Sequence, residues 1–137
     1  MYGSSDKQGQ SLLALVILIG GIILVAGTAL AVVTASFVDS SYGFQSSQQA
    51  QSVATAGVED ALLQLARNNQ FANTGGYSIA VGSSTATVTV TQSSPSAGFA
   101  TILSQATISL RVKKLQVVVS INTITGQTSI VSWTAVQ

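Results

Sequence analysis

The chain opens with a long, uncharged hydrophobic segment. No residue from Gln8 to Val38 carries a charge, and apolar or small residues fill almost all of the stretch from Leu12 to Val33. A helix that crosses a bilayer needs about 20 apolar residues, since each one advances ~1.5 Å across ~30 Å of hydrocarbon. A buried helix of a soluble domain normally keeps a polar face. The pattern therefore predicts a transmembrane helix over residues 10–38.

A second, amphipathic helical pattern follows over residues 39–69. The polar stretch after Val38 contains no proline that would stop a helix. Apolar residues then recur at i, i+4, i+7, i+8 and i+11, which forms one stripe: Ala54, Val58, Ala61, Leu62 and Leu65. Arg67 lies in the last turn, where a cation suits the helix dipole. We predict one nearly continuous helix from about Ser11 to about Asn68, with Gly75-Gly76 marking its exit.

The remainder, residues 77–137, has the composition and alternation of β-strands. Tyr77–Val81 and Thr85–Thr91 flank a turn at Gly82, and Ala86, Val88 and Val90 share one face of the second segment. A last strand is predicted at Thr128–Val136, which contains Trp133. Between them lies a loop at Ser93–Gly98 and a further set of alternating residues.

The alternation changes parity within that further set. Ile108, Leu110 and Val112 share one parity, whereas Leu115, Val117, Val119 and Ile121 share the other. A one-residue shift of parity moves side chains to the opposite face, so we predict a bulge or break at Lys113-Lys114. The fold class that results is α+β: a long N-terminal helix packed on an antiparallel sheet of four to five strands.

Composition excludes most catalytic chemistry. Among 137 residues there is no His and no Cys, with five basic residues, four acidic residues and a net charge of +1. The chain therefore has no imidazole base or thiolate, and no Ser has an evident activating partner. It also has no phosphate-binding glycine loop and no metal-ligand cluster. We expect no enzyme activity, cofactor or metal, and no nucleic-acid partner.

Orientation and processing follow from the flanks of the hydrophobic run. Lys7 and the free amine precede it, and the twenty residues after Val38 contain no Lys or Arg, which favours a cytoplasmic N-terminus. Three fates stay open for the segment: a plain anchor, a secretory signal removed after Ala29-Leu30-Ala31, or a segment cut before the hydrophobic run and retained. A signal h-region is only about 7–15 residues, which counts against the second fate.

The plan and its short motifs resemble type IV pilins and pseudopilins. Lys7-Gln8-Gly9 precedes Gln10-Ser11-Leu12-Leu13, like a short hydrophilic leader that ends in Gly, and Ala54-Thr55-Ala56-Gly57 resembles the A-E-A-G run of some minor pilins. The resemblance implies a leader at residues 1–9, cut between Gly9 and Gln10 by a prepilin peptidase. It also implies an assembly ATPase and platform protein, other pilin subunits as partners, and membrane lipid before assembly in an extracellular filament.

The chain departs from the pattern of major pilins at one position, and the resemblance also predicts which residues form the filament core. Major pilins usually carry Glu at the fifth mature position, which here is Ala14, so a minor or initiating subunit is favoured. The filament core would be built from the apolar side chains of the first helix half: Leu12, Leu13, Ala14, Val16, Ile17, Ile22, Ile23 and Val25.

Five of the nine charged residues and the only tryptophan are candidate subunit contacts. They are Glu59, Asp60, Arg111, Lys113, Lys114 and Trp133. Glu59 and Asp60 point about 100° apart on a helix, so they do not form an acid–base pair. The basic cluster of Arg111, Lys113 and Lys114 could instead protect a sheet edge from pairing with another strand. Trp133 could instead lie in the hydrophobic core.

Two other functions share this pattern. A pseudopilin of a type II secretion or DNA-uptake machine has the same plan. A membrane-tethered adhesin would instead use the loops around Ser93–Gly98 and would remain uncleaved.

Overall fold

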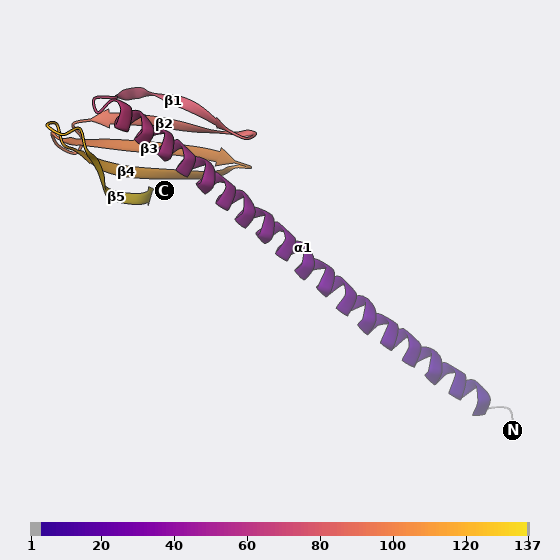
Figure 1. Ribbon diagram of the computed structural model, residues 1–137. Helices are drawn as coiled ribbons and strands as arrows, with labels where there is room; N and C mark the ends of the chain where they lie inside the picture. The colour runs from indigo at the N-terminus through magenta and orange to yellow at the C-terminus, as the bar shows by residue number, and fades with distance from the viewer. Residues whose placement is uncertain (1–3, 137) are drawn as a thin grey trace. The chain divides into compact units, whose positions relative to one another are not determined.

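The computed structural model describes residues 4–136, and only the backbone of residues 4–8. The start of the predicted leader and Gln137 lie outside these residues. Figure 1 shows one helix, α1 (Ser4–Arg67), followed by five strands: β1 (Asn73–Val81), β2 (Ser84–Gln92), β3 (Phe99–Ile108), β4 (Arg111–Ile121) and β5 (Thr128–Val136). The α+β class predicted from the pattern is confirmed.

The chain divides into two compact units, one that ends at Tyr42 and one that begins at Gly43. The first unit is the apolar half of α1. The second unit, called the sheet unit below, contains the packed half of α1 (residues 43–67) together with all five strands. Each unit is described by itself.

The sheet is an open antiparallel meander in which each strand pairs with the next along the chain (Figure 1). The alternation predicted for β2 and β4 is confirmed, since one face of each strand is buried: Ala86, Val88 and Val90 in β2, and Leu115, Val117, Val119 and Ile121 in β4. Short connections hold consecutive strands together, as expected for hairpins joined in series.

The predicted break at Lys113-Lys114 is wrong. Both residues lie inside β4 and pair in unbroken register with Ala106 and Gln105 of β3. The parity changes instead because the chain turns at Ser109-Leu110, which have φ of 47° and 65°. Such left-handed two-residue turns normally use Asn-Gly, so the Ser-Leu pair gave no turn signal.

The start of the sheet also differs from the prediction. β1 begins at Asn73, and Gly75-Gly76 lie within it rather than at the helix exit. The β1–β2 register shifts between Asn73 and Tyr77, so this glycine pair forms a bulge, with Gly76 at a φ of 81°. A glycine pair at a bulge uses the left-handed freedom that other residues lack.

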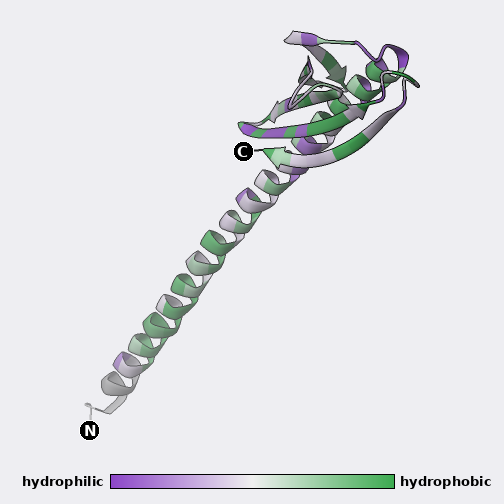
Figure 2. Ribbon diagram, turned by 90° about the vertical axis from the view of Figure 1, so that its left-hand side faces the viewer, coloured by the Kyte–Doolittle hydropathy of each residue, from purple (hydrophilic) through white to green (hydrophobic). Residues whose placement is uncertain are grey.

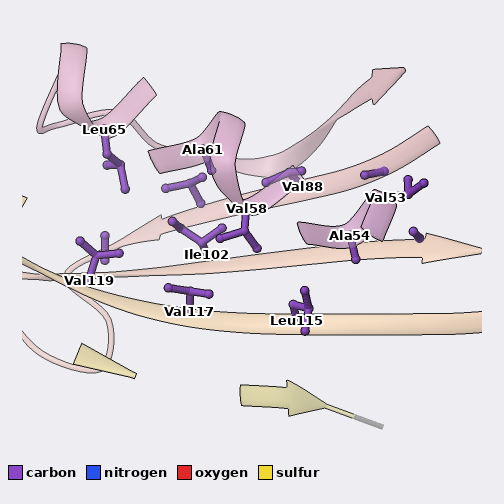
Figure 3. Packing of buried hydrophobic residues seen from close by; sticks show 14 of the residues in the cluster. Val53, Ala54, Val58, Ala61, Leu65, Val88, Ile102, Leu115, Val117 and Val119 are labelled. Carbon is purple, nitrogen blue, oxygen red and sulfur yellow. The ribbon is translucent and has the colours of Figure 1, made fainter. Parts of the chain in front are cut away.

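The packed half of α1 covers the middle of the sheet. Four of the five predicted stripe residues (Ala54, Val58, Ala61 and Leu65) are buried, and Leu62 packs at the margin of the core. Ala50 and Val53 extend the buried stripe towards Gly43. Figure 3 shows the labelled side chains of the helix on the side of Val88, Ile102, Leu115, Val117 and Val119 from β2, β3 and β4; the helix residues are Val53, Ala54, Val58, Ala61 and Leu65.

Gly57 marks the closest approach of helix and sheet. A Cβ added there would collide with the Ser104 hydroxyl, would lie 2.9 Å from Cγ2 of Val88, and would lie 3.1 Å from Cβ of Ala86. The Ser104 side chain is fully buried and its Oγ has no hydrogen-bond partner. The absence of a side chain at Gly57, rather than a bend, is what this glycine contributes.

The helix exit is tied to the sheet by one side chain. Gln92 at the end of β2 donates from Nε2 to the carbonyls of Asn69 at 3.1 Å and Phe71 at 2.8 Å. The Phe71 ring meets Tyr77 edge-on, with centroids 6.0 Å apart. Helix, exit loop and β1 are thereby fixed to each other.

Replacing Gly57 with Ala tests this close approach. Overpacking a well-filled site costs about 1–3 kcal/mol, and the helix propensity gained by Ala offsets at most about 1 kcal/mol of it. We expect the G57A variant to lose stability in urea unfolding of the full chain in detergent micelles, followed by Trp133 fluorescence. A variant as stable as the wild type would contradict the packing described.

Two matched variants complete the test. Gly27 of the apolar half has no atom within 4 Å of its added Cβ, so Gly27→Ala should leave the unfolding of the sheet unit unchanged. Ser104→Ala removes a buried hydroxyl that has no partner, so it should leave stability equal or raise it.

Candidate functional site

The apolar half of α1 is exposed along its described length. Every described side chain from Gly9 to Tyr42 is exposed, which includes the predicted processing residues Gly9 and Gln10 and the predicted packing residues Leu12, Leu13, Ala14, Val16, Ile17, Ile22, Ile23 and Val25. Figure 2 shows hydrophobic residues along this half. The helix is long and apolar enough to cross a membrane. An apolar surface of this extent requires lipid or protein around it.

Three hydroxyl side chains in this half form hydrogen bonds within their own helix. The hydroxyl of Thr28 donates to the carbonyl of Val25 at 2.9 Å, and those of Thr34 and Ser36 donate to carbonyls one turn back, at 2.8 Å and 3.0 Å. A hydroxyl bonded within its own helix can enter an apolar environment without an unpaired donor. These three residues therefore do not oppose burial of the helix.

Small residues shape one face of the same half. A shallow apolar groove of about 470 Å³ follows one stripe of the helix, lined by Leu18, Gly21, Ile22, Val25, Ala26 and Ala29. Residues with little side chain allow another helix backbone to approach closely. The predicted packing residues Ile22 and Val25 belong to this face.

The predicted carboxylate pair is divided between the two flanks of α1. Asp60 faces β1, where its Oδ2 accepts a hydrogen bond of 2.8 Å from the Tyr77 hydroxyl. Burial raises the pKa of the Tyr77 phenol well above its ordinary value, and the hydrogen bond to Asp60 and the charge of Asp60 add to that increase. Asp60 thus holds β1 in place, and Glu59 alone is free to serve as a contact.

Glu59 borders an apolar groove on the opposite flank. The groove, about 510 Å³, lies between α1 and β5 and is lined by Glu59, Leu62, Leu63, Ala66, Thr128 and Ile130. Its two largest apolar walls are open to solvent, because Leu63 is 59% exposed and Ile130 is 51% exposed. The periodicity of the sequence marked neither residue, since Leu63 lies outside the buried stripe.

Trp133 is not a core residue. It lies on β5, pairs with Val117 of β4, and is 42% exposed. The core interpretation is wrong because α1 covers β2, β3 and β4 and leaves β5 uncovered. Trp133 therefore adds apolar surface to the same side of the sheet unit as the groove.

The basic cluster lies at the other end of the sheet unit. Arg111 begins β4 next to the β3–β4 turn, and its guanidinium lies over Gly43. Lys113 and Lys114 alternate across β4, so they face opposite sides of the sheet. Within the described residues none of the three is joined to a carboxylate by an ion pair.

Two residues that the sequence did not place in turns have the most exposed large apolar side chains among the residues whose burial is described. Leu110 in the β3–β4 turn is 96% exposed, and Ile124 in the β4–β5 turn is 93% exposed. Ile124 is held in a turn organised by Asn122, whose Oδ1 accepts from the backbone of residues 124 and 125. Leu110 has no comparable local explanation.

Comparisons with known proteins add no relative. No protein-family model, no curated protein and no solved structure matches this chain. Among the described residues no three His, Cys, Asp or Glu side chains are grouped to hold a metal ion. The candidate site is accordingly a set of interaction surfaces: the apolar half of α1, the groove beside Glu59 and the basic turn beyond Leu110.

The Tyr77–Asp60 contact predicts a pH dependence. Because the folded protein keeps the phenol proton at a pH where the unfolded chain loses it, this contribution to stability is complete below about pH 10 and is lost as the pH rises above that value. We expect urea midpoints of the wild type to fall more steeply above pH 10 than those of Tyr77→Phe. At pH 7 the Y77F variant should be less stable by about 1 kcal/mol, the usual worth of one hydrogen bond. Parallel alkaline profiles would contradict this.

Proposed function

We propose that this chain is a structural subunit, of the minor type, of a type IV pilus-like filament, anchored in the cytoplasmic membrane before assembly. The observation that carries the proposal is the continuity of α1. The described side chains of its first half are apolar on every side and exposed, and the same helix then continues into the half that packs on the sheet. Such a helix suits a subunit that exchanges lipid for neighbouring subunits.

The same segment is suited to both environments. Lipid accepts an apolar helix whose backbone and hydroxyl groups are internally bonded, as they are at Thr28, Thr34 and Ser36. A bundle of equivalent helices accepts it through the small-residue face at Gly21, Ala26 and Ala29. Neither environment requires a change in the helix itself.

The absence of an acidic residue from the apolar part of the helix supports the minor-subunit role. No acidic residue lies between Lys7 and Val38, and Ala14 occupies the fifth position after the proposed cut. In a subunit without a Glu at this position, the N-terminal amine formed by the cut is unpaired in an apolar core. This cost in free energy is large if every subunit of the filament repeats it. A few such subunits, placed at a filament end, avoid this repetition.

The partners follow from the proposal and from the resemblance to pilins. A prepilin peptidase would cut between Gly9 and Gln10, and an assembly ATPase and platform protein would move the subunit from the membrane into the filament. Other pilin subunits would surround the apolar half, and no catalytic step is assigned to the chain itself. A pseudopilin of a secretion or DNA-uptake machine would follow the same steps.

The mature N-terminus tests the processing step. Mass spectrometry of the protein purified from membranes or filaments should give a chain that starts at Gln10. A chain that starts at Met1 would indicate a plain anchor. A chain that starts near Val32 would overturn the proposal, because most of the apolar half of α1 would be gone.

A charge placed on the apolar half tests the buried role. Replacing Ile22 with Asp puts a carboxylate at the small-residue face, where a charge costs about 2.5–3.5 kcal/mol in an apolar environment. We expect immunoblots of sheared filaments to show almost none of this variant. Ile22→Leu, which keeps the volume and apolar character, should be incorporated like the wild type. Normal incorporation of the Asp variant would contradict the buried role.

A further inference from the structure

Leu110 is an exposed apolar side chain in a backbone conformation that is unfavourable for leucine. It is 96% exposed at the tip of the β3–β4 hairpin, with a φ of 65°. A left-handed backbone disfavours residues with a Cβ by about 1–2 kcal/mol, which is why Gly or Asn usually occupies such turns. Neither the fold of the sheet unit nor the solubility of the chain benefits from Leu at this position. A contact beyond the chain would benefit from it.

The groove beside Glu59 has the complementary character. Its walls are the apolar side chains of Leu62, Leu63 and Ile130, and its rim carries one exposed carboxylate, Glu59. The tip of the β3–β4 hairpin carries the opposite charge directly after Leu110, in Arg111.

Tip and groove lie at opposite ends of one sheet unit. Arg111 contacts α1 at Gly43, the beginning of the packed half, whereas the groove lies near its end at Leu63 and Ala66. The twenty residues from Gly43 to Leu63 span ~30 Å of helix. In copies that the apolar half of α1 holds parallel, a surface at one end that fits a different surface at the other end generates an array, because the reciprocal closure of an antiparallel dimer does not arise.

We propose that Leu110 of one copy of this chain inserts into the groove lined by Leu62, Leu63 and Ile130 of the next copy, with Arg111 placed against Glu59. This inference rests on the filament role proposed above and identifies the contact between the sheet units. A single hairpin tip buries far less than the area of about 1,200 Å² that a stable interface needs. The contact therefore sets the register of copies that the apolar half of α1 already holds together.

A second copy is favoured over a lipid surface as the occupant for one reason. A membrane would explain Leu110 and the neighbouring basic residues, but it would leave the acidic, apolar groove without a role. The head-to-tail contact uses both surfaces and joins opposite charges. Contact of Leu110 with lipid is accordingly treated as an outcome of the test that overturns the proposal.

The chain contains no cysteine, which makes crosslinking direct. In a full-length chain carrying both Leu110→Cys and Leu63→Cys, the two thiols of one molecule are ~30 Å apart, whereas a disulfide needs Cα atoms within about 7 Å. Any disulfide is thus intermolecular. We expect oxidation of filaments that contain this double variant to give a ladder of dimers, trimers and higher species on non-reducing gels.

Two matched controls separate specific contact from crowding. The pair Leu110→Cys and Thr87→Cys keeps the same tip but moves the second thiol to an exposed position on the sheet face away from the helix, so no ladder is expected. The pair Leu110→Cys and Leu63→Cys with Glu59→Lys should crosslink about tenfold less, and adding Arg111→Glu should restore the ladder.

The outcomes also separate this inference from the proposed function. If the double-cysteine variant enters filaments and gives no ladder, the tip-in-groove contact is wrong and the filament role stands. If the wild type never enters filaments, both fall. A fluorophore attached to the single variant Leu110→Cys reports on lipid: if bilayer-embedded quenchers quench it in the assembled state, the tip contacts lipid and the contact between copies is refuted.

Discussion

The close seating of α1 on the sheet is the constraint on which the rest of the sheet unit depends. It is achieved by residues that lack bulk on both sides: Gly57, Ala54 and Ala61 on the helix face Ala86, Ala106 and Ser104 on the strands. With the backbones this near, Val58, Leu65 and Ile102 fill the remaining space and are fully buried. A helix centred on β2, β3 and β4 cannot also reach β5, so the groove beside Glu59 is a direct result of this seating.

This constraint explains which elements could be predicted from the sequence. Strands β2 and β4 place Val or Leu at most inward positions, and their alternation predicts both the strands and their buried faces. β3 was harder to recognise because three of its inward residues, Ala100, Ser104 and Ala106, are small where the helix comes close. The role of Gly57 could not be predicted from the helix alone, because it depends on strands that follow it by about thirty or more residues.

The candidate surfaces could be predicted from the sequence only where they consist of consecutive residues of one helix. The uninterrupted apolar run marked the first half of α1, and its exposure agrees with that interpretation. The helix and sheet packing determines that Glu59 and Asp60 lie on different flanks and that Trp133 is exposed, whereas the exposure of Leu110 depends on the position of the β3–β4 turn. Leu110 in particular was assigned to a strand, since a Ser-Leu turn lacks the residues by which left-handed turns are recognised.

The two edges of the sheet bear on how such a chain can polymerise. Both edge strands have their register shifted by a bulge, β1 between Asn73 and Tyr77, and β5 at Val131, where the pairing with β4 skips a residue. An unbroken edge rich in Thr, Val and Ile offers free backbone groups to any similar strand and invites amyloid-like stacking. Because the bulges twist both edges away from a straight ladder, growth of the sheet from copy to copy is obstructed. In the proposed filament, contacts between copies would thereby be directed away from an irreversible aggregate and towards side-chain contacts, which can be made and broken again.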